Sequence, residues 1–371
     1  MRRRTVALGA AVAAWVAALA YDVWLPAGTP TLSWWDVRGI EWLFGLAFVV
    51  TAGLLGGPLV AEPRRARRYW RRFRRDRVAV ASLAVLALLL VAGLAGPAVV
   101  GPPRTDFSQA NLPPVGTTTA ADGGAVHGTL AHPLGTDAQG RDVLVLLLAG
   151  ARVSLEVGLV SAALAVGVGT LVGTTAALAG GRVDEALMRY VDLQQSLPVF
   201  VLLVLLVYLY GSSLVLVVLA YGLLGWERIA RLVRAETLQR RTAGYVRAAE
   251  AAGASRWWVL RRHVLPNAST TVITAATLAV PAFVLGEAAL SFLELGPPDA
   301  YSWGRTITAG RQSLATAPWV STAPGVALFL TVLALNYVGE GLRDALDPAS
   351  DRDRNRPAAG DRIPAEDPPR R

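Results

Sequence analysis

Few residues in this sequence could carry out catalysis. The chain contains no cysteine and three histidines, His127, His132 and His263, which are too scattered to indicate a metal site. All 36 basic residues are arginine, and the absence of lysine excludes a phosphate-binding loop, because a lysine is part of that motif. No nucleophile and base form a catalytic pattern either. We therefore expect no cofactor, no bound metal and no enzymatic activity, so that any ATP hydrolysis must come from another chain.

The residues best suited to a specific contact lie in a polar, arginine-rich stretch, residues 244–267, between two apolar spans. Its first part carries small side chains at helical spacing: Ala248, Ala249, Ala251 and Ala252. Another protein can approach such a helix closely. Gly253 suits the end of this helix, and Ser255 suits the N-cap of a second helix over residues 256–263, which Pro266 prevents from continuing. The stretch is predicted to form helix, turn and helix; the alternative is a solvated loop whose alanines merely favour helix.

The composition indicates an integral membrane protein. The chain has 371 residues, of which 53% are hydrophobic, and several apolar runs are long enough to cross a bilayer. Its net charge of +9 could suggest nucleic-acid binding. However, the arginines cluster in loops between apolar spans, which membrane topology alone would produce, so we expect no nucleic-acid partner.

Six apolar runs are predicted to form the membrane-spanning core: residues 78–99, 155–178, 187–209, 213–224, 270–292 and 319–338. The second run carries Ala165, Gly169, Gly173 and Ala177 at intervals of four, a pattern that lets membrane helices pack backbone to backbone. Arginine asymmetry places residues 244–267 inside the cell and residues 101–134 outside. The membrane domain is expected to cover residues 78–348, followed by a proline-rich, disordered cytoplasmic tail over residues 349–371.

The N-terminal part has a different organisation. Residues 1–62 contain two apolar runs, 5–25 and 41–60, and are predicted to form a transmembrane hairpin; the alternative is a signal peptide cleaved near residue 20. Residues 63–77 then carry nine arginines, which the positive-inside rule places in the cytoplasm together with the N-terminus. With Tyr69, Trp70 and Phe73 beside them, these arginines could bind anionic membrane lipid; the alternative is a topological anchor and nothing more.

A second motif precedes the second core span, at residues 132–142 (HPLGTDAQGRD). Thr136 and Gln139 have capping-box spacing for a helix that runs into residues 143–148. On physical grounds alone, the motif is a capped helix start. Its candidate residues are Gly135, Thr136, Asp137, Gly140, Arg141 and Asp142.

The stretch 244–267 resembles the "EAA" loop of ABC importer permeases, the cytoplasmic element that docks into the ATPase subunit. The resemblance rests on the spacing of Ala248 and Ala249, Gly253, and the run from His263 through Leu265 to Pro266. Where the family usually has glutamate, this chain has Arg247, with Glu250 three residues later. That departure affects one polar contact to the ATPase and leaves the docking helix in place.

Four regions in the same order resemble the second type of permease subunit in dipeptide, oligopeptide and nickel ABC importers: residues 132–154, 244–267, 287–304 and 341–348. Glu294, where glycine is usual, and the N-terminal hairpin depart from the family pattern. The resemblance implies an all-α membrane fold with a six-helix core, residues 78–348. It also implies a heterodimer with a second permease chain, two cytoplasmic ATPase subunits and an extracytoplasmic solute-binding protein.

The implied function is a conduit that works by alternating access, for dipeptides or oligopeptides. Importers of nickel or oligosaccharides share the pattern and stay open as alternatives. A secondary transporter is a rival from another class, with Glu287 as its best intramembrane ionisable residue.

Overall fold

The computed structural model describes residues 63–121, 124–259 and 265–346, so the expected N-terminal hairpin and C-terminal tail lie outside it. The described part is helical, as expected. Its helices are α4 (Pro63–Phe73), α5 (Arg77–Val100), α6 (Val143–Ala179), α7 (Gly181–Ser196), α8 (Val199–Tyr210), α9 (Leu214–Leu224), α10 (Glu227–Arg241), α11 (Gly244–Ala251), α12 (Arg256–Val259), α13 (Leu265–Phe292), α14 (Trp303–Ala309) and α15 (Trp319–Leu346).

Four helical segments of the described chain are long and apolar enough to cross a membrane: Arg77–Gly96, Val143–Ala179, Thr270–Phe292 and Trp319–Leu346. Three match predicted spans closely, although the last continues eight residues beyond residue 338. The predicted span 155–178 is part of a longer helix, because α6 runs without a break for 37 residues.

The predicted span 187–209 is not one straight helix. It is divided between α7 and α8, which meet at an angle of 75°. Pro198 explains the bend, because a proline disfavours helical backbone in the residue before it, and Leu197 is extended (φ −96°, ψ 126°). The predicted span 213–224 forms α9, whose 11 residues reach about 16 Å, roughly half of a bilayer core.

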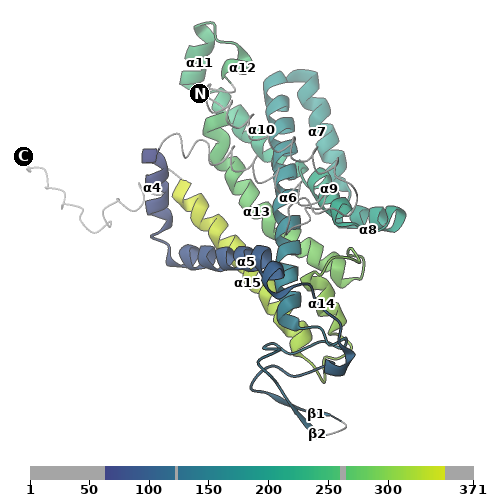
Figure 1. The fold of residues 1–371 in the computed structure, drawn as a ribbon. Coiled ribbons are helices and arrows are strands. Elements are labelled where there is room, and N and C mark those ends of the chain that lie inside the picture. Colours follow the sequence, from purple (N-terminus) through teal and green to yellow (C-terminus); the bar gives the residue numbers. More distant parts are fainter. Residues whose placement is uncertain (1–62, 122–123, 260–264, 347–371) are drawn as a thin grey trace, which may run out of the picture.

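Helix α6 is the axis of the molecule, and α5, α7, α9, α10 and α13 all pack against it (Figure 1). The predicted ridge of small residues explains the closest of these contacts. A Cβ added at Gly169 would lie 2.9 Å from the carbonyl oxygen of Trp226, and one at Gly173 would clash with the carbonyl oxygen of Ala230. The ridge therefore lets α10 lie directly on the α6 backbone.

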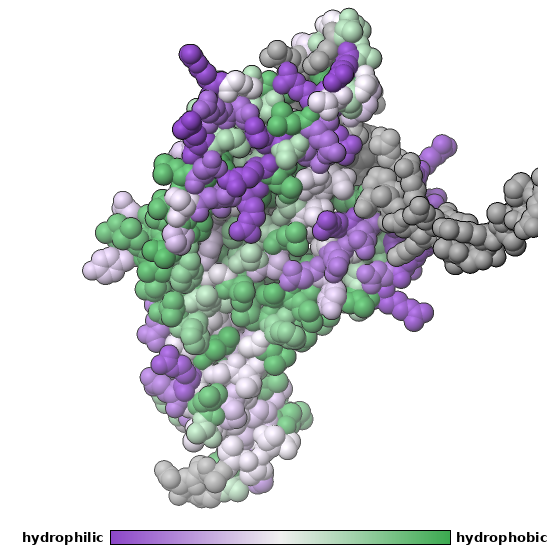
Figure 2. Space-filling view, turned by 180° about the vertical axis from the view of Figure 1, so that it is seen from behind, coloured by the Kyte–Doolittle hydropathy of each residue, from purple (hydrophilic) through white to green (hydrophobic). Residues whose placement is uncertain are grey.

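Two strands extend the end of the molecule opposite α11 and α12 (Figure 1). Strands β1 (Thr118–Ala121) and β2 (Gly124–His127) pair antiparallel, with Thr118 opposite His127 and Ala121 opposite Gly124. This hairpin lies in the predicted outer loop, where the sequence analysis expected no strand. Figure 2 shows hydrophobic side chains gathered across the middle of the molecule and hydrophilic side chains over the end that carries α11 and α12.

Candidate docking hairpin and outer clamp

The docking hairpin, residues 244–259, has the predicted helix, turn, helix structure. Gly253 ends α11 with left-handed backbone (φ +84°), and the N–H of Ala254 donates to the carbonyl oxygen of Ala249 at 3.1 Å. The hydroxyl of Ser255 accepts from the N–H of Trp258 at 3.3 Å, as expected of an N-cap. The chain therefore reverses direction over four residues.

The second half of the motif differs from the prediction. Helix α12 is described only to Val259, and His263 lies outside the described residues. Pro266, which was predicted to prevent the second helix from continuing, is the second residue of α13, which begins at Leu265. The first turn of a helix tolerates proline because its N–H would have no intrahelical partner there.

The docking hairpin has a small apolar core and an exposed face of short side chains. Val246 and Val259 are buried, and Ala249, Ala254 and Leu178 of α6 pack against them. The exposed positions include Arg247, Ala248, Ala251, Ala252 and Gly253. Glu250 belongs to α11, but its side chain lies outside the described part. The sequence-predicted residues of α11 thus divide between the hairpin core, which holds Ala249, and a surface that a second protein could approach closely.

Helix α10 fixes the docking hairpin to the rest of the molecule. Arg234 binds Asp184 of α7 in a bidentate ion pair, with N–O distances of 2.5 and 2.6 Å. Arg231 binds Asp192 at 2.5 Å, and Arg241 donates to the carbonyl oxygen of Ala177 at 3.1 Å. The sequence did not predict these partners. Arg231 and Arg234 are three positions apart and Arg241 is seven further along, and this spacing on one helical face was the available signal.

The outer clamp, residues 132–142, is organised around a buried carboxylate. Asp137 is 2% exposed and accepts from the N–H groups of Gln139 and Arg141, both at 2.9 Å. Arg141 also donates its Nε to Asp137 at 2.7 Å, while its guanidinium lies 6.0 Å from the ring centre of Tyr301. Gly140 supplies the left-handed backbone of this turn (φ +71°), where a Cβ would collide with the carbonyl of Asp106.

The predicted capping box at Thr136 and Gln139 is wrong, and Asp142 caps α6 instead. Asp142 accepts from the N–H of Leu144 at 2.7 Å. The Thr136 hydroxyl is used elsewhere: it accepts from the N–H of Leu112 at 2.8 Å and donates to the carbonyl of Gln109. The turn around Asp137 accounts for the error, because it pairs Thr136 with Asp142 in a short β-bridge and moves the helix start.

The outer clamp also joins the outer loop to distant helices. His132 lies between Asp142, at 2.9 Å, and Gln109. Trp319 of α15 donates to the carbonyl oxygen of Thr136 at 3.1 Å, beside Gly135, whose backbone is left-handed (φ +77°). In the adjoining loop, hydrogen bonds from the side chain and the backbone N–H of Ser108 lower the pKa of Asp106. The polar groups of the clamp are largely used in internal contacts, so its role in the fold is structural.

A buried carboxyl group lies between α13 and its neighbours. Glu287 has no exposed surface, and Ser291 donates to its Oε1 at 2.7 Å. Its Oε2 and the hydroxyl of Ser154 have no hydrogen-bond partner of good geometry among the described residues, although Ser154 and Ser302 both lie near this carboxyl group. By contrast, Glu156, two residues after Ser154 on α6, forms an ion pair with Arg152 at 2.9 Å. Glu287 is therefore enclosed by protein, in a polar cluster with serines.

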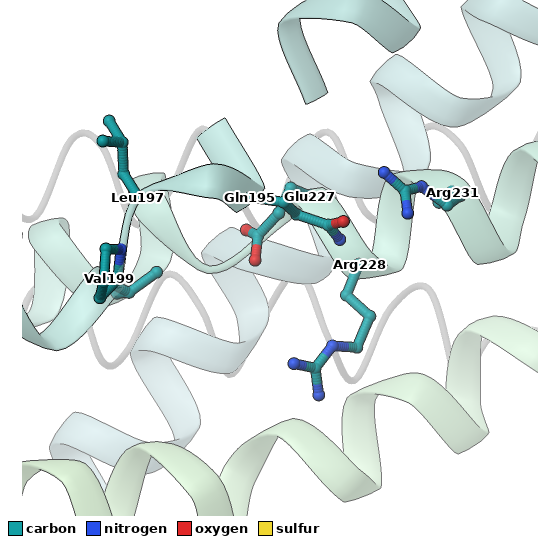
Figure 3. Close-up of a pocket in the computed structure, with 7 residues that line it drawn as sticks. Gln195, Leu197, Val199, Glu227, Arg228 and Arg231 are labelled. Atoms are coloured by element: carbon teal, nitrogen blue, oxygen red, sulfur yellow. The ribbon is translucent and has the colours of Figure 1, made fainter. Parts of the chain in front are cut away.

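A cavity of about 600 Å³ lies at the bend between α7 and α8. Gln195, Leu197 and Val199 come from the bend, and Glu227, Arg228 and Arg231 come from the first turns of α10 (Figure 3). Glu227 is 8% exposed, and its Oε2 has no hydrogen-bond partner in the part of the chain that the structure describes. The cavity thus presents both signs of charge and can hold a polar solute.

Comparison with known sequences agrees with this architecture. Residues 157–352 match the family described as binding-protein-dependent transport system inner membrane component. Residues 65–114 match the family described as N-terminal TM domain of oligopeptide transport permease C.

Similar proteins cover most of the chain. The oligopeptide transport system permease protein OppC of Haemophilus influenzae is 36% identical over 279 residues, 75% of this chain and 86% of that protein. OppC of Escherichia coli K12 is 37% identical, over 75% of this chain and 89% of that protein. The dipeptide transport system permease protein DppC of Bacillus subtilis is 35% identical, over 75% and 84%. This chain therefore belongs to the family of binding-protein-dependent transport system inner membrane components.

Proposed function

We propose that this chain is a permease subunit of an ATP-driven ABC importer for dipeptides or oligopeptides. The names of its relatives support the solute class. The observation that carries the proposal is the docking hairpin, whose short exposed side chains lie at the end of the helices α6 and α10. A rigid, closely approachable hairpin is what an ATPase subunit needs in order to move the membrane helices.

The docking hairpin and the basic segment 63–77 face the cytoplasm in this proposal, together with both termini. The outer clamp and the β1–β2 hairpin then face the solute-binding protein outside. Two ATPase subunits and a second permease chain complete the complex. Helix α8 supports a contact with the second chain or with lipid, because it exposes large apolar side chains such as Val201, Leu205 and Leu209.

We assign the cavity at the α7–α8 bend to the solute path. A peptide carries an ammonium group and a carboxylate at its two ends, and the cavity offers Glu227 and Arg228 as complementary charges. Glu287, the candidate of a secondary transporter, is enclosed and does not line this cavity.

The test is uptake by cells that lack their own peptide importers and express this chain with its second permease, ATPase and binding-protein subunits. We expect radiolabelled dipeptide or oligopeptide uptake that stops when the ATPase is inactivated. Uptake of nickel or an oligosaccharide, but no peptide, would contradict the solute class. Uptake that continues with an inactive ATPase would contradict the ATP-driven mechanism.

A further inference from the structure

Helix α4, the turn after it and the first residue of α5 display a dense group of positive charges. Seven arginine side chains are exposed there: Arg64, Arg67, Arg68, Arg71, Arg74, Arg75 and Arg77. None of them forms an ion pair or a side-chain hydrogen bond with another residue that the structure describes. Asp76 is the one carboxylate in this segment, and its Oδ1 is already used by the N–H groups of Val78 and Ala79, at 2.9 and 3.1 Å. The charges are therefore free to meet a counterpart from outside the described chain.

The apolar side of α4 holds the helix in place. Ala66, Tyr69, Trp70 and Phe73 follow helical spacing along one face. Phe73 is 6% exposed and packs against Ala79 of α5 and Ala345 of α15. The helix thus lies at the corner between α5 and α15, and this packing holds the helix that carries the arginines in a fixed position (Figure 1).

Two further features place α4 at the surface of the bilayer. The membrane-crossing segment of α5 begins at Arg77, only four residues after α4 ends at Phe73. Trp70 is 49% exposed and stacks on Phe73, with ring centres 5.9 Å apart. An exposed tryptophan beside arginines is typical of helices that lie at the level of the lipid headgroups.

We propose that α4 and the turn after it form a binding site for the headgroups of anionic phospholipids. Arginine binds phosphate oxygens in a bidentate manner, and a row of arginines on a fixed helix offers several such sites at the depth of the phosphates. A segment that served only as a topological anchor would need the charges but not the packing of Phe73. Negatively charged headgroups also relieve the repulsion among the seven arginines.

The experiment uses the purified full-length chain in neutral detergent, with phosphatidylglycerol or phosphatidylcholine added as the probe. Native mass spectrometry counts the bound lipids, and thermal unfolding measures the stabilisation. The test variant is Arg67→Gln, Arg68→Gln and Arg71→Gln together. The control variant carries Arg104→Gln, Arg182→Gln and Arg311→Gln, which removes the same charge at exposed sites outside α4.

We expect the wild-type and control proteins to prefer phosphatidylglycerol and to be stabilised by it. In the α4 variant, the preference for phosphatidylglycerol over phosphatidylcholine should fall at least about tenfold. High salt should weaken the same preference in the wild-type and control proteins. An unchanged preference in the α4 variant would overturn the proposal. Neither readout needs transport, so the result is independent of the proposed function.

Discussion

Replacing Gly253 by valine tests the docking hairpin directly. Gly253 has left-handed backbone (φ +84°), and a Cβ added there would meet nothing within 4 Å in the described chain. The cost within the chain is therefore backbone strain alone, about 1–2 kcal/mol, because an L residue is disfavoured at positive φ. The core formed by Val246 and Val259 is not altered. We expect the variant to insert into the membrane and to unfold close to the wild-type temperature.

If an ATPase subunit packs against this turn, the same substitution also weakens the association of the two proteins. Overpacking of a close contact costs about 1–3 kcal/mol. This corresponds to roughly 5- to 150-fold weaker association. Recovery of the ATPase subunits with the tagged permease should fall accordingly, and most peptide uptake should be lost.

Gly101→Val is the matched control. Gly101 also has positive φ (+78°) and open space around it, but it follows α5, on the outer side in the proposed topology. Gly253→Asn separates strain from packing, because asparagine tolerates left-handed backbone and still adds a side chain. We expect Gly101→Val to retain the ATPase and Gly253→Asn to lose part of it. Wild-type ATPase recovery and uptake with Gly253→Val would refute the reasoning. Ala254 would be a poor control, because it packs in the hairpin core.

Two further predictions follow from the fold. Gly173→Val should push α10 away from α6 and lower the unfolding temperature of the purified chain by at least about 3 °C. Gly167→Val, in open space on the same helix, should have little effect on that temperature. Equal shifts in the two variants would contradict the role of the ridge. Because the chain has no native cysteine, single cysteines report topology: Ala131→Cys should react with an impermeant reagent on intact cells, and Ser255→Cys should react only after lysis. Labelling of the second variant from outside would reverse the proposed orientation.

The features that the sequence predicted correctly depend on short-range rules. Gly253 and Ser255 each act on residues a few positions away, so their types alone indicate the turn of the docking hairpin. Gly169 and Gly173 form a ridge by helical spacing, although the sequence did not say that α10 would occupy it. The long apolar runs likewise located α5, α13 and α15.

The features that were missed depend on partners far along the chain. Thr136 has the spacing of a capping residue, but its hydroxyl is taken by Gln109 and Leu112, more than 20 residues away. Arg234 pairs with Asp184 over 50 residues. The spacing of the α10 arginines marks one helical face, but no local pattern identifies the distant partner of Arg234 or of Thr136. The bend at Pro198 differs, because its signal was local and the apolar run around it outweighed it.

Helix α6 connects the outer clamp to the docking hairpin. Its 37 residues span about 55 Å, and Asp142 caps one end while the Ala177 carbonyl binds Arg241 near the other. Leu178, one residue further, packs in the core of the docking hairpin. If an ATPase moves the hairpin, as proposed, we expect this continuous helix to carry the displacement to the clamp, because packed helices shift as rigid bodies more readily than they deform.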